Sequence, residues 1–198
     1  MKPAEVPVFL WGVDIHCFTE NRSVSQTNKV ACMKGFREHV LYLDFDGVLH
    51  HERVLWHPKV GPYMSAPERF KLFMHVNLLE ELLEPYPQIL IVLSTSWAKR
   101  YGVVHAAKNL SPSLRNRVIG GTWHSRMNSD EFMEKPRGVQ IYEDTLRRKP
   151  RAWLALDDDY ENWPEHCLGN LVMTHGQEGI GDSVVLAQFK QKLRQLGA

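Results

Sequence analysis

Five short apolar runs constrain the fold of this chain more than any other feature of its sequence. Their apolar residues are mostly continuous instead of alternating with polar ones, which is typical of strands covered on both faces, as in a parallel sheet. The predicted strands are VLYLDF (40–45), ILIVL (89–93), RVIG (117–120), AWLAL (152–156) and NLVMT (170–174). Helix-like segments separate them, and this alternation implies right-handed crossovers. We therefore expect an α/β three-layer sandwich with a mostly parallel, Rossmann-like central sheet of about five strands.

Four segments outside these runs repeat apolar residues at helical spacing. Their apolar stripes are Leu72, Val76, Leu79 and Leu83; Val103, Ala107, Leu110 and Leu114; Val139, Tyr142 and Leu146; and Val185, Phe189, Leu193 and Leu196. The first helix is predicted to begin near Ser65, because Glu68 follows three residues later with Pro67 between them, and to end before Pro85.

The length of 198 residues and the hydrophobic content of 43% suit one globular domain with a core and are too small for two ordinary ones. Residues 1–38 show no sustained period and include the polar stretch TENRSVSQTNK. We expect them to be a leader of unknown role that could be flexible. The domain itself is expected to span residues 39–198.

The overall composition excludes several classes of protein. Twenty-four basic and 23 acidic residues give a net charge of +1, which is no signature of a dedicated nucleic-acid or membrane binder. Three widely spaced cysteines without a CxxC pair argue against a disulfide framework and a zinc cluster. No apolar run approaches the roughly 20 residues of a membrane span. We expect a cytoplasmic protein that does not contact a membrane.

Polar residues end or directly follow three of the predicted strands. They are Asp44 and Asp46 at and after the end of the first strand, Ser94, Thr95 and Ser96 after the second, and Asp157, Asp158 and Asp159 after the fourth. In a parallel sheet, ligands bind beyond the carboxyl ends of the strands. Any one of these groups alone could be a turn or a helix cap, but together and in this order they favour a functional site.

The carboxylates at this predicted rim would repel one another and raise each other's pKa unless a cation lay among them. A site made only of oxygen ligands points to a hard divalent ion, and in particular to Mg²⁺, which takes one or two carboxylates together with a phosphate. The sequence therefore predicts a magnesium site that acts on a phosphate.

The same residues resemble a known family. LYLDFDGVLH, IVLSTSW, a basic residue within EKPRGVQI, and WLALDDD are similar to the four signature motifs of the haloacid dehalogenase (HAD) superfamily. More narrowly, they resemble the capless HAD domain of bacterial Swiss Army Knife RNA-repair proteins. The resemblance runs from about residue 40 to the end of the chain and implies a HAD-like fold and a phosphatase activity.

The resemblance also implies roles for individual residues. Asp44 would be the nucleophile and would become an aspartyl phosphate, while Asp46 would protonate the leaving oxygen and later deprotonate water. Ser94 would donate a hydrogen bond to a phosphoryl oxygen, with Thr95 as the alternative. Gly47 would allow the tight turn as the chain leaves the strand.

The metal ligands follow from the same comparison. Asp157 would bind Mg²⁺ directly and Asp158 directly or through water. Asp44 would be a further ligand, and Asp46 would contribute its backbone carbonyl.

The third motif matches the family pattern poorly and leaves two candidates for its basic residue. Lys135 and Arg137 both precede or begin the helix before the fourth strand, where a cation would balance the charge of nucleophile and phosphate. We favour Arg137, because the narrower family tends to place Ile four residues after its Arg, as Ile141 stands here. The two would not be interchangeable, since Lys is a point charge and Arg a planar fork.

Two further features could concern the substrate. His50, close behind the first motif, could line the substrate entrance. Trp97 and Trp123 follow strand ends, where an aromatic ring could stack on a base, although packing in the core is the more common role of such rings.

No inserted cap domain is expected. Residues 51–64 are predicted to form only a loop, and residues 97–134 are used up by a core helix and strand. An uncovered site cannot exclude water by closing over a small metabolite. This favours a large substrate, such as a nucleic-acid end or a phosphoprotein, or a partner that supplies the lid.

The sequence as a whole predicts a Mg²⁺-dependent phosphohydrolase that forms an aspartyl phosphate, with the phosphate on a nucleic-acid end as the favoured substrate. One alternative is a non-catalytic HAD-fold module that binds phosphorylated or nucleic-acid partners, for which the unclear third motif is the supporting feature. Another is phosphotransfer to an acceptor other than water, which uses the same residues.

Overall fold

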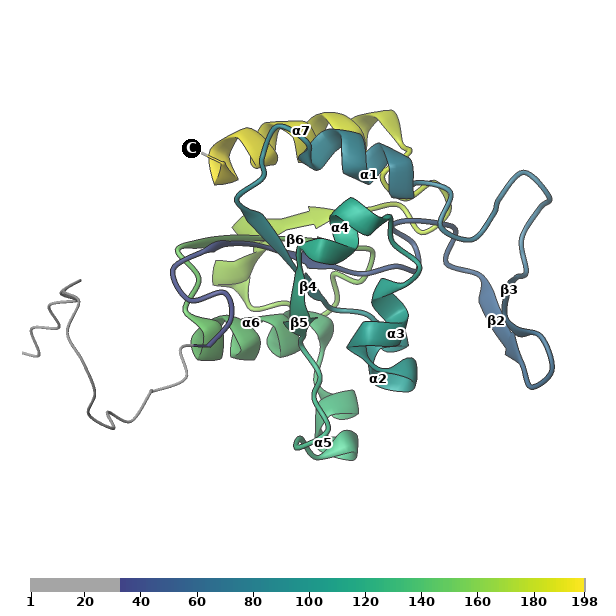
Figure 1. The fold of residues 1–198 in the computed structure, drawn as a ribbon, viewed down its shortest axis with the longest axis horizontal. Coiled ribbons are helices and arrows are strands. Elements are labelled where there is room, and N and C mark those ends of the chain that lie inside the picture. Colours follow the sequence, from purple (N-terminus) through teal and green to yellow (C-terminus); the bar gives the residue numbers. More distant parts are fainter. Residues whose placement is uncertain (1–32, 198) are drawn as a thin grey trace, which may run out of the picture. The chain divides into compact units, whose positions relative to one another are not determined.

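A five-stranded sheet forms the centre of the structure, a computed structural model that describes residues 33–197 (Figure 1). The strand order is β5 (Val118–Gly121), β4 (Ile89–Leu93), β1 (His39–Leu43), β6 (Ala152–Asp157) and β7 (Leu171–Met173). Every neighbouring pair is parallel. The predicted α/β fold with a parallel sheet of five strands is therefore confirmed.

The connections place a topological switch point at the centre of the sheet. From β1 the chain runs outward to β4 and β5, and it then returns to β6 on the other side of β1. Ligands of open α/β sheets bind beyond the carboxyl ends of the strands at such a point. The sheet therefore directs attention to the residues that follow β1 and end β6.

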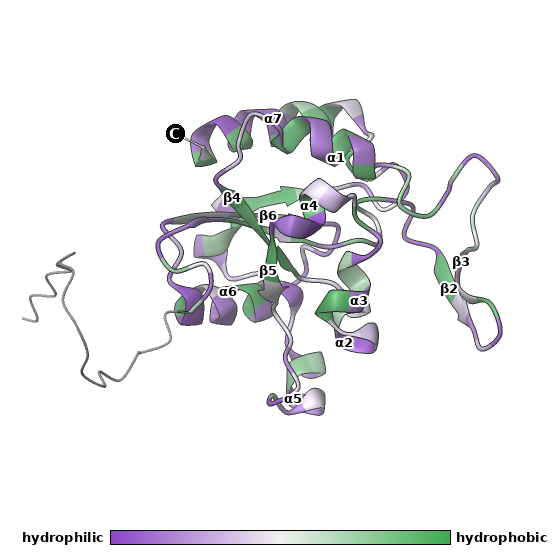
Figure 2. Cartoon of the chain, viewed as in Figure 1, coloured by the Kyte–Doolittle hydropathy of each residue, from purple (hydrophilic) through white to green (hydrophobic). Residues whose placement is uncertain are grey.

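Helices cover both faces of the sheet. Helices α1 (Val76–Leu83) and α7 (Ser183–Leu196) lie on one face and α6 (Arg137–Arg148) on the other (Figure 1). Successive strand residues point to opposite faces, so Leu41 belongs to a buried cluster with Leu79 and Phe189, and Tyr42 to another with Ile141. Figure 2 shows the strands of the sheet as predominantly hydrophobic, in agreement with burial on both sides.

Helix α1 begins at Val76, eleven residues later than the predicted start at Ser65. The chain between them forms turns instead, in which Phe70 N–H donates to the Pro67 carbonyl. Phe73 has a φ of 58°, a left-handed conformation that a helix cannot contain. The prediction of a capping box at Ser65 is therefore wrong, whereas the end of the helix before Pro85 is confirmed.

The second predicted stripe does not lie on one helix. Helix α2 (Ser96–Tyr101) precedes it, and the stripe is divided between α3 (Val103–Ala107) and α4 (Pro112–Asn116), with Leu110 between them. Gly102, with a φ of 82°, separates α2 from α3. Ser111 accepts a hydrogen bond from Leu114 N–H and caps α4. Ala107, Leu110 and Leu114 are still buried, and Val103 is partly buried against the same core.

The third stripe is confirmed only in part, because Tyr142 packs, partly buried, against the cluster that contains Ile141. Leu146 is 56% exposed, whereas the buried side chains of α6 include Ile141, Asp144, Thr145 and Arg148. The last stripe, in α7, is confirmed, since its apolar residues Val185, Phe189, Leu193 and Leu196 are all buried.

Residues 51–64 contain a two-stranded antiparallel hairpin instead of the predicted loop. Its strands are β2 (Val54–His57) and β3 (Gly61–Met64), and it extends away from the sheet (Figure 1). Nothing larger is inserted between β1 and α1 in the described chain, in agreement with the expected lack of a cap domain.

The remaining elements are helix α5 (Ser129–Glu134), between β5 and α6, and the 3-10 helix η1 (Glu165–Asn170), between β6 and β7. Within residues 33–197, no helix is both long and apolar enough to cross a membrane. The predicted leader falls outside the described residues except for residues 33–38.

Candidate active site

The register of the sheet brings three of the predicted polar residues into one row. Leu43 of β1 is aligned with Leu93 of β4 and Leu156 of β6. The residues that follow these three leucines are Asp44, Ser94 and Asp157, respectively. Backbone bonds hold this alignment past the strand ends, since Asp44 N–H donates to the Leu156 carbonyl at 3.1 Å and Ser94 N–H to the Leu43 carbonyl at 2.8 Å.

The carboxylates of Asp44, Asp157 and Asp158 form the acidic centre of the site. One oxygen of each lies within 4.8 Å of the others, and Asp44 and Asp157 are buried. Burial and the charge of neighbouring carboxylates, above all Asp44, raise the pKa of Asp157 well above its ordinary value and that of Asp158 to about 7. Burial likewise raises the pKa of Asp44. The raised pKa values mean that the protein alone does not stabilise the charged forms of these three acids.

A divalent cation fits these residues. The donor set consists of carboxylate oxygens, which hard ions such as Mg²⁺ prefer. Asp157 Oδ2 is buried and accepts no hydrogen bond from the described residues, although Arg137 Nε lies 3.4 Å away as an ion pair. A buried carboxylate oxygen without a hydrogen bond is costly unless a charge satisfies it.

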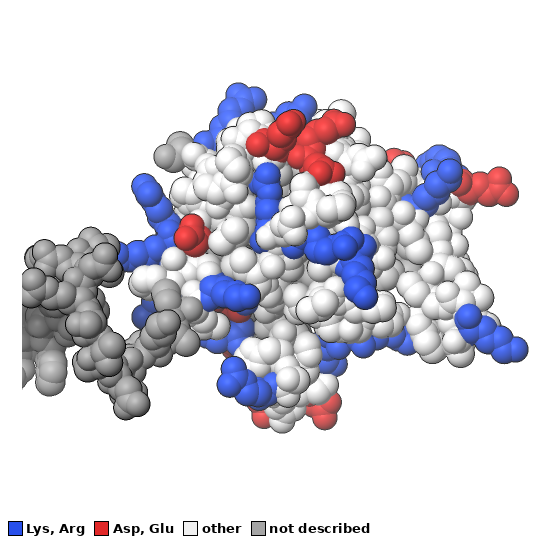
Figure 3. Space-filling model, viewed as in Figure 1, with Lys and Arg blue, Asp and Glu red and all other residues white. Residues whose placement is uncertain are grey.

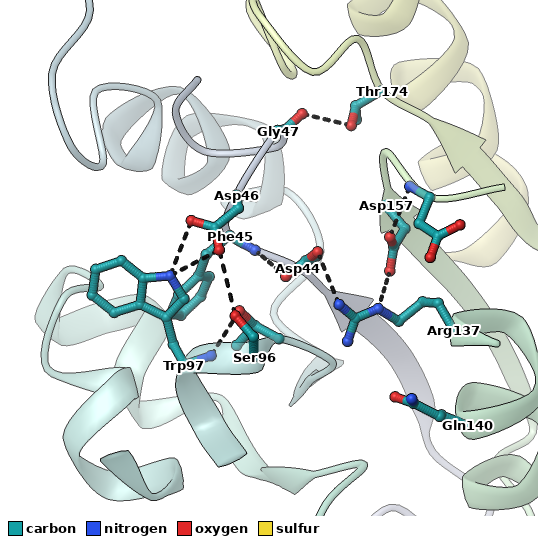
Figure 4. A network of polar contacts seen from close by, with 12 residues as sticks. Asp44, Phe45, Asp46, Gly47, Ser96, Trp97, Arg137, Gln140, Asp157 and Thr174 are labelled. Atoms are coloured by element: carbon teal, nitrogen blue, oxygen red, sulfur yellow. Dashed lines mark hydrogen bonds and ion pairs between the residues drawn. The ribbon is translucent and has the colours of Figure 1, made fainter. Parts of the chain in front are cut away.

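Gly47 makes room for one of these acids. It has a φ of 66°, and a Cβ atom at this position would lie 2.0 Å from Asp158 Oδ2. Its carbonyl accepts a hydrogen bond of 2.7 Å from the buried Thr174 hydroxyl, as Figure 4 shows. The turn after β1 therefore needs glycine for two reasons, its backbone conformation and the close approach of Asp158.

Arg137 lies between two carboxylates of the acidic centre (Figure 4). Its Nη2 is 3.4 Å from Asp44 Oδ2, and its Nε is 3.4 Å from Asp157 Oδ2. Burial alone would lower the pKa of Arg137, but the charges of Asp44 and Asp157 outweigh it and raise the pKa. Gln140 fixes the chain before α6 by donating to the carbonyls of Phe132 and Lys135.

Lys135 takes a different position. Its Nζ pairs with the Glu143 carboxylate at 2.7 and 2.9 Å, away from the acidic centre. Lys135 borders a cavity of about 200 Å³ that Arg137 and Thr95 also line. Of the two predicted candidates for the basic residue, the structure brings only Arg137 into contact with Asp44 and Asp157.

Asp46 lies apart from the acidic centre and is held by donors from α2 and from the chain after β1. Trp97 Nε1 donates to both of its carboxylate oxygens at 3.0 and 3.1 Å, and the Ser96 hydroxyl lies 3.5 Å from Oδ2. Its side chain is 29% exposed. Asp46 is therefore oriented by protein donors while it remains open to a substrate.

His50 does not line an entrance, as the sequence suggested, because it is fully buried. Its Nδ1 accepts a hydrogen bond of 3.3 Å from Phe73 N–H, and its Nε2 lies 3.0 Å from Asp46 Oδ1. An imidazole that accepts at one nitrogen carries its proton on the other, so Nε2 donates to Asp46. The left-handed turn at Phe73 thus serves to fix His50.

Ser94 and Thr95 differ in how their hydroxyls are used. Ser94 Oγ is buried and has no hydrogen-bond partner among the described residues. Thr95 Oγ1 accepts from Trp97 N–H and caps α2. Accepting this bond leaves the Thr95 hydroxyl proton free to donate, so either hydroxyl can offer a donor to a phosphoryl oxygen, and Ser94 is the one whose hydroxyl has no partner among the described residues.

Sequence reasoning missed the contribution of Trp97 to the site. Trp97 is 6% exposed and packs edge-on against Phe73, in agreement with core packing as the more common role of such a ring, but no prediction included the hydrogen bonds of its indole N–H to Asp46. The signal was present in the Ser-Trp pair of the second motif, which α2 places directly over Asp46.

The comparisons with known proteins agree with this geometry. A family model described as the HAD domain in Swiss Army Knife RNA repair proteins matches residues 40–185, which include all of the site residues above. Searches among curated proteins and among solved structures gave no match. The chain therefore belongs to this family of HAD domains, and that membership supports a phosphohydrolase of the HAD type as its coarse function.

Proposed function

We propose that the protein is a Mg²⁺-dependent phosphatase that cleaves phosphate monoesters through an aspartyl phosphate on Asp44. The observation that carries the proposal is the convergence of the Asp44, Asp157 and Asp158 carboxylates within 4.8 Å, with the Arg137 guanidinium against two of them. Such a centre offers a nucleophile, a cation site and a fixed positive charge within one phosphate's reach.

Asp44 is suited to attack phosphorus. Its Oδ1 accepts a hydrogen bond of 2.7 Å from Phe45 N–H, which fixes the carboxylate, and its Oδ2 faces Arg137. In the first step a bond forms between an Asp44 oxygen and phosphorus, and the bond from phosphorus to the leaving oxygen breaks. Asp46 gives its proton to that leaving oxygen.

The second step reverses the role of Asp46. Water attacks the phosphorus of the aspartyl phosphate, Asp46 takes a proton from the water, and the bond between phosphorus and the Asp44 oxygen breaks. Inorganic phosphate and free Asp44 result. Trp97 and His50 hold Asp46 in place for both transfers.

The phosphoryl group would be held by groups that already surround Asp44. Ser94 would donate its hydroxyl to one phosphoryl oxygen, and Arg137 would balance the negative charge that develops there. Asp44, Asp157, Asp158 and the backbone carbonyl of Asp46 would hold Mg²⁺. When bound, the ion supplies positive charge that offsets the repulsion between these acids and the phosphate.

The end of a nucleic acid is the substrate that we favour. The support is the family to which the chain belongs, whose description names RNA repair proteins, together with the lack of an inserted cap over the site in the described residues. The non-catalytic alternative rests on the unclear third motif, whereas the contacts of Arg137 with Asp44 and Asp157 support the catalytic proposal.

Hydrolysis of an aryl phosphate tests the proposal. Phosphate release should require Mg²⁺, stop when the metal is chelated, and disappear in Asp44→Asn, because an amide cannot form the aspartyl phosphate. Asp130→Asn, an exposed acid in the first turn of α5, is the matched control and should keep full activity. Activity that survives Asp44→Asn would refute the nucleophile.

A further inference from the structure

A cavity of about 510 Å³ adjoins the site on the side of Asp46. The β2–β3 hairpin, helix α2 and the segment around Trp123 supply its walls, and Asp46 and Ser96 also line it. Its volume lies within the range of roughly 300–1,000 Å³ that ligand pockets occupy.

The chemistry of Asp46 decides which part of a substrate enters this cavity. A group that protonates the leaving oxygen must face the leaving group, not the transferred phosphoryl. Asp46 lines the cavity, whereas Asp44, Asp157 and Ser94 do not. The leaving group of the phosphate ester is therefore the part that the cavity receives.

Exposed aromatic and apolar side chains on the hairpin lack an explanation in the fold. Trp56 is 44% exposed and Leu55 is 50% exposed, and both line the cavity. The hairpin does not contribute either residue to the buried core. An exposed apolar surface that includes a large ring, beside the group proposed as the general acid, is typical of a groove that binds a ligand or a partner.

Cations lie against two of the rings that line the cavity. Arg100 Cζ lies 4.5 Å from the centre of the Trp56 ring, and Lys99 Nζ lies 5.6 Å from that of Trp123. Among the described residues that line the cavity, Asp46 is the one acid. On the face of the molecule drawn in Figure 3, the charged side chains of the lower part are mostly basic, whereas acidic ones gather near α1 at the top.

Aromatic rings interleaved with basic side chains are the usual means of binding single-stranded nucleic acid, because bases stack on the rings and phosphates pair with the cations. A sugar phosphate would instead need many polar side chains to bind its several hydroxyl groups. Among the described residues that line the cavity, three carry a hydroxyl group, Ser96, Tyr101 and Ser129, and most of the others are aromatic, apolar or basic.

We propose that this cavity is the nucleoside subsite, in which the base of the terminal, phosphate-bearing nucleotide stacks on Trp56 of the hairpin. Lys99 and Arg100 face the next phosphate of the strand. This inference rests on the proposed function, because it places the leaving nucleoside relative to Asp46. The hairpin is then the element that selects nucleic-acid ends in a domain without a cap.

Kinetics on two kinds of substrate test the subsite. A short single-stranded oligonucleotide with a terminal phosphate has a base for the cavity, whereas glycerol phosphate has no ring. Trp56→Ala should lower kcat/KM on the oligonucleotide by about 10-fold or more, chiefly through KM, since stacking on an aromatic ring contributes roughly 1–3 kcal/mol per base. The loss on glycerol phosphate should be much smaller, and Trp56→Phe should recover most of the oligonucleotide activity.

Val60→Ala is the matched control. Val60 is a 73% exposed apolar residue of the same hairpin, and it does not line the cavity. Val60→Ala should leave the activity on both substrates unchanged, which distinguishes an effect of losing the Trp56 ring from an effect of general damage to the hairpin.

Other outcomes would overturn the subsite. Equal losses on both substrates in Trp56→Ala, or none on either, would refute base stacking while leaving the phosphatase intact. A phosphotyrosine peptide that is cleaved faster than the oligonucleotide, and in a Trp56-dependent way, would assign the cavity to a protein substrate. If no phosphate ester is cleaved at all, the proposed function itself fails.

Discussion

Arg137 and Lys135 show how two neighbouring cations of one motif can have different surroundings. Arg137 begins α6 and contacts Asp44 and Asp157, whereas Lys135 lies before the helix and pairs with Glu143. Spacing along the sequence cannot distinguish them, because two residues of irregular chain before a helix do not fix the direction of a side chain. The contacts of the two side chains with the acids distinguish them.

Substitution of the two cations should therefore have unequal effects. Arg137→Met should lower kcat/KM for an aryl phosphate by about 10²–10³, as the loss of one charge that stabilises a transition state commonly does. Lys135→Met should have little effect, since its partner Glu143 lies on the surface. Steady-state kinetics with saturating Mg²⁺ would measure both. Equal losses would contradict the assignment of Arg137.

The raised pKa of Asp158, about 7 against an ordinary value of 3.8, should make the metal-free protein sensitive to pH. Because the folded state favours the neutral carboxyl, this contribution to stability is complete below about pH 4 and is lost as the pH rises through about 7. The Tm of the metal-free protein should therefore fall over that range, and less so in Asp158→Asn.

Mg²⁺ should raise the Tm most at the upper end of the same range, since it binds ionised carboxylates. Thermal unfolding of the wild type and of Asp158→Asn, with and without Mg²⁺, measures the pH dependence of the Tm and its increase on metal binding. Parallel pH curves for wild type and Asp158→Asn would show that Asp158 is not the responsible group.

Among the elements, those with a buried apolar pattern were predictable from the sequence and those without one were not. The strand at 89–93 was predicted at its observed bounds, and α7 with its observed buried face. The hairpin was missed because β2 is mostly exposed, so no core imposes a pattern on it. The start of α1 was misplaced because Phe73 turns the chain toward His50, a contact that no local signal reveals.

The part of the site that lies at the ends of the strands was as predictable as the strands themselves. Asp44, Ser94 and Asp157 could be grouped because each directly follows or ends a buried strand of a parallel sheet. The roles of Trp97 and His50 could not be, since a hydrogen bond from either ring to Asp46 depends on how α2 and the turn at Phe73 pack.

The turn after β1 can be tested by comparing two glycines that both have positive φ. Gly47→Ala adds a Cβ against Asp158, whereas Gly102→Ala adds one in open space. Both should lose stability through backbone strain, but only Gly47→Ala should weaken Mg²⁺ binding, because it displaces a ligand. Calorimetric titration with Mg²⁺ measures the difference. Equal affinities in the two variants would rule out this role of Gly47.

At the scale of the whole molecule, a buried ionic network on the α6 face connects parts of the chain that are distant in sequence. Asp144 accepts hydrogen bonds from Tyr42, Arg147 and Arg148. Arg148 also donates to the carbonyls of Lys34 and Gly121. Burial and the charge of Asp144 raise the pKa of the Tyr42 hydroxyl, which therefore stays a donor. In the sequence these charges resemble a solvated helix face.

Removing the centre of this network should be costly. Asp144→Ala should lower the free energy of unfolding by about 3–5 kcal/mol, because it leaves Arg148 buried without its partner. Glu143→Ala, the neighbouring residue in an exposed pair with Lys135, should cost less than about 1 kcal/mol. Urea denaturation measures both. Similar small losses would show that the network contributes little.

The two halves of the acidic centre also differ in when they are synthesised. Asp44 stands at the tip of β1, but Asp157 and Asp158 follow more than a hundred residues later, at the end of β6. A nascent chain on the ribosome exposes its nucleophile long before it has a complete cation site. Catalysis of the proposed kind therefore has to wait until translation has passed β6 and that strand has inserted beside β1.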